Sequence, residues 1–181
     1  GGLEAACAAG FAAVKVNTVV IRGFNDDEIG DLLEFCRQRG VEPRFIEYMD
    51  VGGATCWTPA AVMPRCQVLA RLEQRFGPIR PEPRHDTAPA DRFLLEDGTR
   101  FGVIASVSEP FCGRCDRSRL TADGRWYLCL YAREGIDLRR VLRREGQPGV
   151  LRTIGAAWRT RADRGAEQRR HDPGRGVLCQ V

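Results

Sequence analysis

The fold class follows from two strand-like runs, Val14-Lys15-Val16-Asn17-Thr18-Val19-Val20 and Arg44-Phe45-Ile46-Glu47-Tyr48-Met49. Both runs are rich in the β-branched and aromatic residues that are typical of strands. Between them, acidic residues after Asn25 and a glycine at Gly40 predict a helix over about 26–39, capped by Asn25. Strand, helix and strand in this order indicate a βαβ unit, and thus an α/β fold with a parallel sheet.

Helices are also predicted on both sides of this unit. Leu3 to Ala9 is helix-like and ends at Gly10, and a further helix begins at Thr58-Pro59 and continues to about Phe76. Such alternation is typical of a parallel sheet or barrel, in which ligands bind at the C-terminal ends of the strands. We therefore expect residues 1–76 to form one region with a parallel sheet or part of a barrel.

Beyond residue 76 the pattern changes from alternating helices and strands to hairpins. A turn at Glu96-Asp97-Gly98 predicts one antiparallel hairpin over 93–106, and a turn at Asp123-Gly124 predicts a second, pairing 117–121 with 125–131. Helices are predicted from about 137 to 144 and from 148 to 160. We expect a proline-rich connector at 77–90, a smaller α+β region at 91–160, and a weakly ordered polar tail at 161–181.

Three cysteines lie at a spacing that suits a metal or an iron–sulfur cluster. Cys112 and Cys115 are separated by two residues, and Cys129 lies in the second hairpin, which brings it back towards the pair. Thiolates bind zinc and iron–sulfur clusters, and a structural zinc normally has four protein ligands. Since no fourth Cys or His lies nearby in the sequence, the spacing favours a cluster whose unique iron binds another molecule.

Two other interpretations of these cysteines stay open. Their site could hold zinc, completed from a distance by His85, His171 or Cys179, or they could be ordinary buried residues. The other five cysteines are isolated, which indicates a reducing cytoplasm rather than a disulfide framework. No apolar run approaches the roughly 20 residues that span a bilayer, so no membrane partner is expected.

Cations lie beside the cysteines and within the strands. Arg117 and Arg119 are two residues apart on a predicted strand, so both would point to one face. They would bind a ligand rich in oxyanions or in hydrogen-bonding groups, unless both are solvated. Lys15 lies among valines in a run that looks buried on both faces, where an unpaired ammonium is costly. It would then face a polar lumen and an anion, with Asn17 on the same face; the alternative is a surface lysine on an edge strand.

The second strand run carries further candidates. Met49 falls at its C-terminal end, where a methionine is either a core residue or a ligand contact, and Glu47 is either a ligand contact or a paired charge. The net charge is +4, and most basic residues are arginines, which favour phosphate and carboxylate contacts. Net charge does not separate a nucleotide from a nucleic acid as the partner.

Taken together, the two strand runs and the run Phe111-Cys112-Gly113-Arg114-Cys115-Asp116-Arg117-Ser118-Arg119-Leu120-Thr121-Ala122-Asp123-Gly124, which ends in Cys129-Leu130, resemble the GTP 3′,8-cyclases. These are radical S-adenosylmethionine enzymes that begin molybdenum cofactor synthesis. The resemblance extends from Gly2 to about Trp158. It implies the C-terminal part of an incomplete TIM-like (β/α) barrel, followed by a smaller α+β iron–sulfur domain.

The resemblance also implies a role for each matching residue. Three cysteines would hold a second 4Fe-4S cluster whose open iron meets the guanine of GTP, while polar residues contact the rest of that nucleotide. By position, the cluster ligands are Cys112, Cys115 and Cys129; the GTP contacts are Arg117, Ser118 and Arg119; the phosphate contacts are Lys15 and Arg44; and the S-adenosylmethionine contact is Met49.

The family reaction uses a 5′-deoxyadenosyl radical to join ribose C3′ to C8 of the base, which gives (8S)-3′,8-cyclo-7,8-dihydroguanosine 5′-triphosphate. The implied partners are GTP, S-adenosylmethionine and cyclic pyranopterin monophosphate synthase as the downstream enzyme. Neither nucleic acid nor a membrane is expected, and the resemblance leaves a homodimer of the full-length protein open.

Two family motifs are absent from these 181 residues: the CxxxCxxC motif of the first 4Fe-4S cluster and the C-terminal Gly-Gly tail. We therefore expect the chain to be inactive alone, as a fragment or a degenerate copy. Two alternative functions remain: the auxiliary-cluster half of a radical enzyme that modifies a peptide, and a zinc-ribbon module that binds nucleic acid through its arginines.

Overall fold

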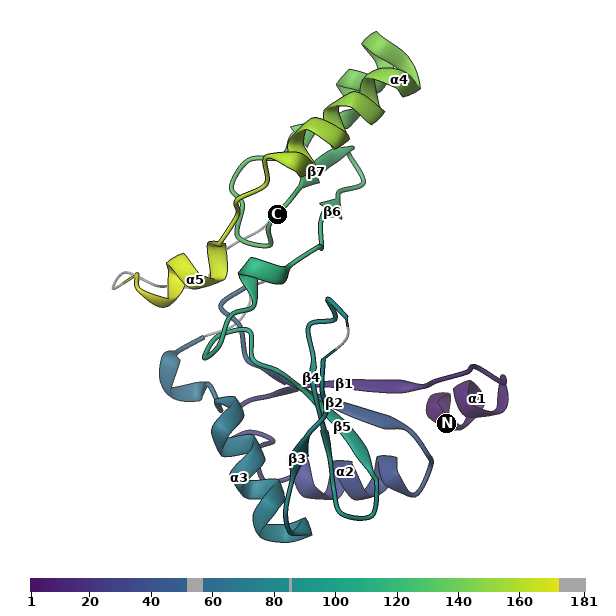
Figure 1. Ribbon diagram of the computed structural model, residues 1–181, viewed down its shortest axis with the longest axis vertical. Helices are drawn as coiled ribbons and strands as arrows, with labels where there is room; N and C mark the ends of the chain where they lie inside the picture. Colours follow the sequence, from purple (N-terminus) through teal and green to yellow (C-terminus); the bar gives the residue numbers. More distant parts are fainter. Residues whose placement is uncertain (52–56, 85, 173–181) are drawn as a thin grey trace. The chain divides into compact units, whose positions relative to one another are not determined.

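The computed structural model describes residues 1–51, 57–84 and 86–172. These residues form two compact units, one over residues 1–111 and one over residues 112–172. The elements of both units are labelled in Figure 1.

The first unit is built on a five-stranded mixed sheet with the order β1-β2-β5-β4-β3. The strands β1 (Lys15–Val20), β2 (Glu42–Glu47) and β5 (Arg100–Ile104) are parallel neighbours. The strands β4 (Asp91–Leu94) and β3 (Arg80–Pro81) run antiparallel beside β5. The predicted α/β class and βαβ unit are confirmed, although the sheet is mixed because β4 and β3 are antiparallel. The first predicted hairpin belongs to this sheet, and the division between the two units falls after Phe111. The functional region predicted to begin at residue 91 remains a prediction.

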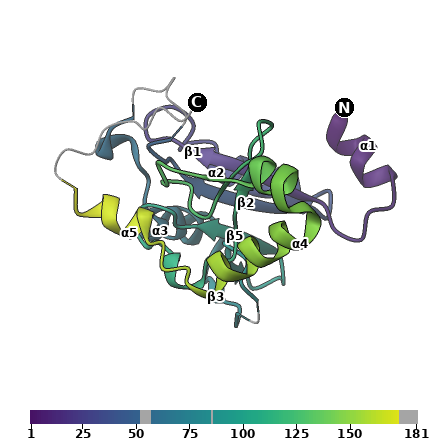
Figure 2. The same cartoon turned by 90° about the horizontal axis from the view of Figure 1, so that it is seen from above.

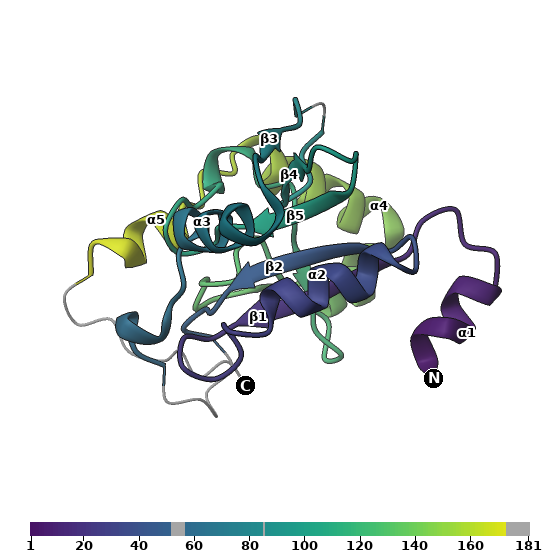
Figure 3. The same ribbon diagram turned by 90° about the horizontal axis from the view of Figure 1, so that it is seen from below.

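Helices α2 (Ile29–Arg37) and α3 (Arg65–Phe76) lie side by side over one face of this sheet (Figure 3). Successive side chains of a strand point to opposite faces, and in β2 the buried residues alternate with half-buried ones. The buried set faces the helices, and Phe45 of this set belongs to the hydrophobic core. That core combines Leu33 and Leu72 from the helices with Phe45, Phe93, Phe101 and Val103 from the strands.

The start of α2 differs from the prediction. The helix begins at Ile29 with Glu28 as its N-cap, and Asn25 does not cap it. Instead, the Asn25 side chain accepts a hydrogen bond from the Ile21 backbone N–H at 2.8 Å and donates one to the Val19 carbonyl at 2.9 Å. Asn25 therefore fixes the turn that follows β1.

The single helix predicted from Thr58 to Phe76 is also wrong, because the structure has two separate elements there. A 3-10 turn, η1 (Pro59–Ala61), is followed by extended backbone at Val62, and α3 begins only at Arg65. The break has a local cause in Pro64, since proline lacks an N–H and disfavours helical backbone in the residue before it.

Helix α1 (Gly2–Ala8) confirms the helix predicted at the start of the chain. It buries none of its side chains and lies beyond the starting end of β1 (Figure 2). Its contact with the rest of the first unit includes the pair of Glu4 with Arg39 at 3.8 Å. Gly10, with φ of +75°, lies just after the helix as predicted.

The second unit contains a three-stranded antiparallel sheet of β6 (Arg119–Leu120), β7 (Arg125–Tyr127) and β8 (Ile136–Asp137). The short helix η2 (Cys112–Arg114) precedes it. The second predicted hairpin is confirmed, although its strands are shorter than predicted, with β6 paired to β7 over two positions. Gly124, in the turn of this hairpin, has φ of +85°.

Helix α4 (Leu138–Arg159) follows and is interrupted at Gly146, where φ is 64° and ψ is −168°. This break separates the two helices that the sequence predicts. Near the end of α4, Trp158 stacks on the buried Trp126 of β7 with ring centroids 6.2 Å apart. A further helix, α5 (Gly165–Arg170), occupies part of the segment for which weak order was predicted. Across the described ranges, every helix is too short or too polar to cross a membrane.

Candidate cluster and nucleotide site

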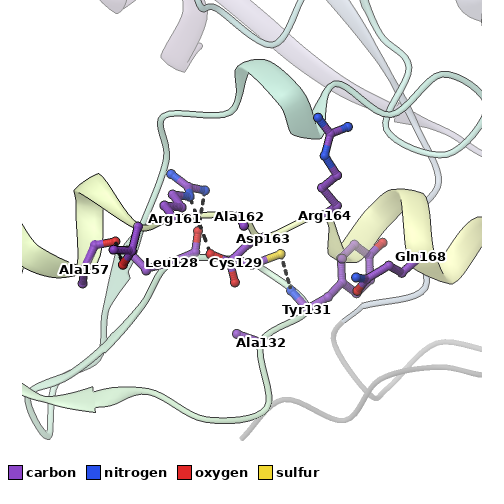
Figure 4. Close-up of a pocket in the computed structure, with 12 residues that line it drawn as sticks. Leu128, Cys129, Tyr131, Ala132, Ala157, Arg161, Ala162, Asp163, Arg164 and Gln168 are labelled. Carbon is purple, nitrogen blue, oxygen red and sulfur yellow. Dashed lines mark hydrogen bonds and ion pairs between the residues drawn. The ribbon is translucent and has the colours of Figure 1, made fainter.

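All three predicted ligand cysteines lie in the second unit, and each thiol is half-buried and outside any disulfide. Cys112 begins η2, in which the Cys115 backbone N–H donates to the Cys112 carbonyl at 3.2 Å. Cys129 lies two residues beyond β7, so the hairpin determines its position. Its Sγ accepts a hydrogen bond from the Tyr131 backbone N–H at 3.5 Å (Figure 4).

Two arginines donate hydrogen bonds to the Cys115 thiol. Arg117 does so through its backbone amide and its side chain, and Arg161 does so through Nη2 at 3.7 Å. Burial raises the pKa of this thiol, but the hydrogen bonds and the charge of Arg117, together with the Arg161 hydrogen bond, outweigh burial and lower the pKa overall. A lowered pKa favours the thiolate, which is the form that binds metals.

Arg161 is a site residue that the sequence did not reveal. Its side chain is 10% exposed, its Nη2 also donates to the Leu128 carbonyl at 2.6 Å, and its guanidinium lies 4.9 Å from the ring centroid of Trp158. Its Nη1 is buried and has no hydrogen-bond partner within the described ranges. The one signal for Arg161 in the sequence is that it follows Trp158 by three positions, a spacing that allows its guanidinium to stack on the aromatic ring.

A cavity of about 470 Å³ adjoins this arginine. Leu128, Cys129 and Tyr131 line it from the hairpin side, and the segment around Arg161 and Arg164 lines it from the other side (Figure 4). The cavity wall therefore combines one predicted ligand cysteine with two cations.

The donor set of this unit contains three cysteines, the residue type that binds iron–sulfur clusters as thiolate. Among the described residues, no three His, Cys, Asp or Glu side chains gather closely enough to hold a metal ion. A four-iron cluster spans more space than one ion and holds its thiolates further apart. This unit offers three thiols as ligands for such a cluster, and the lowered pKa of Cys115 favours the thiolate. It also offers a buried Arg161 N–H that has no acceptor among the described residues. Of the distant zinc ligands suggested by the sequence, His85 and Cys179 lie outside the described residues, and His171 is exposed after α5.

Arg117, Ser118 and Arg119 follow the Cys112–Cys115 pair after Asp116, and all three are exposed. The prediction that both arginines lie on one strand is wrong, because β6 begins only at Arg119. Arg117 instead lies in the loop between η2 and β6, where it hydrogen-bonds to Cys115.

The predicted phosphate contacts share one face of the first unit's sheet. Lys15 pairs in register with Glu42, and Asn17 pairs with Arg44, so all four side chains point away from the face that α2 and α3 cover. The Arg44 Nε donates to Glu42 at 2.8 Å. The prediction that β1 is buried on both faces is wrong, since β1 is an edge strand of the described sheet and Lys15 is exposed.

Two candidates lie at the C-terminal end of β2. Met49 is half-buried and lies two residues beyond the strand. Glu47, which is 2% exposed, is bound entirely within the protein: its carboxylate accepts from the backbone N–H of Arg65 at 2.9 Å and from those of Val107 and Ser108 at 2.7 Å each. Glu47 therefore anchors the start of α3 and the loop after β5 to the end of β2.

The first unit thus has a mixed α/β sheet, and the second unit has three cysteines beside arginines. Residues 41–167 match the family Molybdenum Cofactor Synthesis C, and the chain belongs to this family.

Within this class, the chain is similar to proteins named GTP 3′,8-cyclase, which confirms the predicted resemblance. It is 55% identical to GTP 3′,8-cyclase 1 of Mycobacterium tuberculosis over 99% of its length. It is 45% identical to the GTP 3′,8-cyclase of a Synechococcus species over 93% of its length, and 44% identical to that of Aquifex aeolicus over 87%. The chain spans about half the length of these relatives, namely 50%, 49% and 47%.

Proposed function

We propose that this chain is the cluster- and GTP-binding half of a GTP 3′,8-cyclase, with Cys112, Cys115 and Cys129 as ligands of a 4Fe-4S cluster. The observation that carries the proposal is the Cys115 thiol, which accepts hydrogen bonds from Arg117 and Arg161 in a chain of this family. The complete enzyme would convert GTP to (8S)-3′,8-cyclo-7,8-dihydroguanosine 5′-triphosphate with S-adenosylmethionine, as the first step of molybdenum cofactor synthesis.

The residues around the cysteines suit the base and sugar of GTP. A bound cluster with three protein ligands would supply an open iron position for an atom of the guanine ring. Arg117 and Arg119 are exposed next to Cys115 and can donate to oxygen and nitrogen atoms of the nucleotide, while the Ser118 hydroxyl can donate or accept. Their place within four residues of Cys115 supports a role in orienting the nucleotide.

The helix-free face of the first unit suits the triphosphate. Lys15 and Arg44 lie on neighbouring strands of this face, and Glu42 fixes the Arg44 guanidinium through Nε. A guanidinium fork binds phosphate oxygens bidentately. Met49 lies beyond the C-terminal end of β2 and would contact S-adenosylmethionine. In barrels, ligands bind at this end of the parallel strands. Three parallel strands with helices over one face support the interpretation of this unit as part of a barrel wall.

We expect these 181 residues to bind GTP without converting it, because they contain no CxxxCxxC motif for the cluster that cleaves S-adenosylmethionine. In the cell the product of the complete enzyme would pass to cyclic pyranopterin monophosphate synthase in the cytoplasm.

A GTP titration of the anaerobically reconstituted chain tests this proposal. Arg117→Ala and Arg119→Ala should each weaken GTP binding about tenfold or more, because a hydrogen bond to a charged group contributes roughly 1.5–3 kcal/mol and about 1.4 kcal/mol is tenfold in affinity. Arg143→Ala, which removes an exposed arginine of α4, is the matched control and should bind GTP normally. Normal GTP affinity in both test variants would contradict the assignment, and a peptide that displaces GTP would favour a peptide-modifying enzyme instead.

A further inference from the structure

We propose that the segment Arg161–Gly165 is a built-in part of the cluster site, in which Arg161 hydrogen-bonds to the cluster's sulfur atoms and raises its reduction potential, and Gly165 leaves room for Cys129. This inference rests on the proposed function, because it requires the three cysteines to hold a cluster.

The segment lies against each of the three cysteines. Arg161 donates to Cys115 Sγ at 3.7 Å. Arg164 interacts electrostatically with Cys112, and a side-chain carbon placed on Gly113 would lie 3.1 Å from Arg164 Nη2. A side-chain carbon on Gly165 would lie 2.8 Å from Cys129 Sγ. Three residues of one short segment thus lie near a ligand set that is spread over eighteen positions of the sequence, from 112 to 129.

Arg161 is held as a hydrogen-bond donor towards sulfur. The Leu128 carbonyl accepts from its Nη2 at 2.6 Å, and the Trp158 ring lies beneath its guanidinium at 4.9 Å, so the fork has a fixed orientation. Its buried Nη1 has no acceptor among the described residues, and such an orphaned donor is costly in a folded protein. The inorganic sulfides and thiolates of a cluster are acceptors of the kind that this N–H lacks.

Hydrogen bonds to the sulfur atoms are one of the factors that set the potential of an iron–sulfur cluster. Reduction adds one electron from an external reductant and so adds one negative charge to the cluster. A buried guanidinium that donates to its sulfur atoms stabilises the reduced form more than the oxidised form. Arg161 therefore makes the reduction of the cluster more favourable.

Gly165 has a steric role. A side-chain carbon there would lie 2.7 Å from the Tyr131 Cβ as well as 2.8 Å from Cys129 Sγ, and both distances are shorter than real contacts of a Cβ atom. The atoms in its way belong to the loop that carries a cluster ligand, so an alanine at this position would displace that ligand.

A reductive titration with dithionite on the reconstituted chain, followed by electron paramagnetic resonance, tests the role of Arg161. Arg161→Met should keep the cluster but make its reduction about tenfold less favourable, which is a potential about 59 mV more negative for one electron. Arg159→Met, at the exposed last residue of α4 and two positions before Arg161, is the control and should leave the potential unchanged. A potential for Arg161→Met equal to that of the unsubstituted chain would overturn the proposal.

Arg161→Lys decides the question if Arg161→Met does not fold. It keeps the positive charge, but an ammonium cannot reproduce the guanidinium fork that reaches Leu128 and Cys115 together. A smaller shift in the same direction is expected, and an unchanged potential would overturn the proposal.

The iron content tests the role of Gly165. Gly165→Ala should lose iron relative to the unsubstituted chain, whereas Gly155→Ala, where the nearest atom to the new carbon is the flexible end of Arg159, should keep it. Equal iron in both variants would overturn the steric role. An unsubstituted chain that takes up no iron or sulfide would instead refute the proposed function, so the two failures are distinguishable.

Discussion

At the scale of the residue, one buried carboxylate organises the end of the first unit's sheet. Glu47 is the last residue of β2, and both its oxygens accept hydrogen bonds from backbone N–H groups of α3 and of the loop after β5. An ionised carboxylate offers only acceptors, so it matches a site made of donors. The residues that follow β2, including Met49, depend on this anchor for their position.

Glu47→Gln should destabilise the chain by about 2 kcal/mol or more, because the amide NH₂ would face N–H groups and leave buried donors unsatisfied. Urea unfolding measures the effect. Glu34→Gln, which removes the carboxylate of an exposed pair with Arg37, is the control and should cost at most about 1 kcal/mol. Equal stability of the two variants would show that the anchor contributes little.

Lys15 offers a direct test of the phosphate site, because it is the one lysine of the sequence. An amine-acylating reagent followed by mass spectrometry reports on its accessibility. GTP should protect Lys15 from acylation while guanosine should not, since the proposed contact is with the phosphates. The N-terminal amine serves as an internal control, and equal labelling of Lys15 with GTP and with guanosine would contradict its role.

At the scale of the element, the β6–β7 hairpin determines where Cys129 lies. Its turn needs a glycine at 124, because φ is +85° and a side-chain carbon there would lie 2.6 Å from the Arg139 Cβ. Gly98, in the hairpin of the first unit, has nearly the same φ of +84°, but a side-chain carbon there would have no atom within 4 Å. The two glycines therefore separate backbone strain from steric clash.

Gly98→Ala should cost about 1–2 kcal/mol from left-handed backbone alone, and Gly124→Ala should cost more because a clash adds to the strain. Gly124→Ala should also lose iron, since its hairpin carries Cys129, whereas Gly98→Ala should not. Thermal unfolding and iron content are the measurements. Full iron content in Gly124→Ala would show that the turn does not position the ligand.

Elements whose signals are local could be predicted from the sequence. The β-branched run before Val20, the turn at Asp123-Gly124 and the helix break near Gly146 each depend on neighbouring residues. Asn25 and Arg161 could not be assigned, because their partners are set by tertiary structure. Asn25 binds the end of β1 instead of a helix N-terminus, and Arg161 reaches Cys115, which lies 46 positions away in the sequence.

At the scale of the whole molecule, the two units have unequal cores. In the first unit both helices and the sheet strands contribute to a continuous hydrophobic core. In the described part of the second unit, the buried hydrophobic side chains are Trp126 and Leu138. A unit of this size with so small a core usually needs a metal or another cross-link for stability, so a cluster would contribute to its folding.

Removal of the cluster with an iron chelator should therefore unfold the second unit and leave the first unit folded. Hydrogen exchange measured peptide by peptide is suited to this question. Amides of β7 and α4 should lose protection after chelation, while those of β2 and β5 should keep it. Unchanged protection of α4 would show that the second unit folds without the cluster.

The sequence also predicted the α/β class, but not which of the two units each hairpin belongs to. The two hairpins look alike as local patterns, because each is a short pair of strands around a glycine turn. What distinguishes them is the pairing of β5 with β2, a contact between strands more than fifty residues apart. A local pattern carries no information about such a pairing, which is why the predicted boundary at residue 91 divides the sheet of the first unit.

The central claim is that Cys112, Cys115 and Cys129 bind a four-iron cluster. The most direct test is the iron, sulfide and zinc content of anaerobically purified chain, together with its visible absorption spectrum. The account predicts about four irons and four sulfides per chain, as the 4Fe-4S stoichiometry requires, with visible absorption that is lost in Cys112→Ala. One equivalent of zinc without visible absorption would contradict it and indicate a structural zinc site.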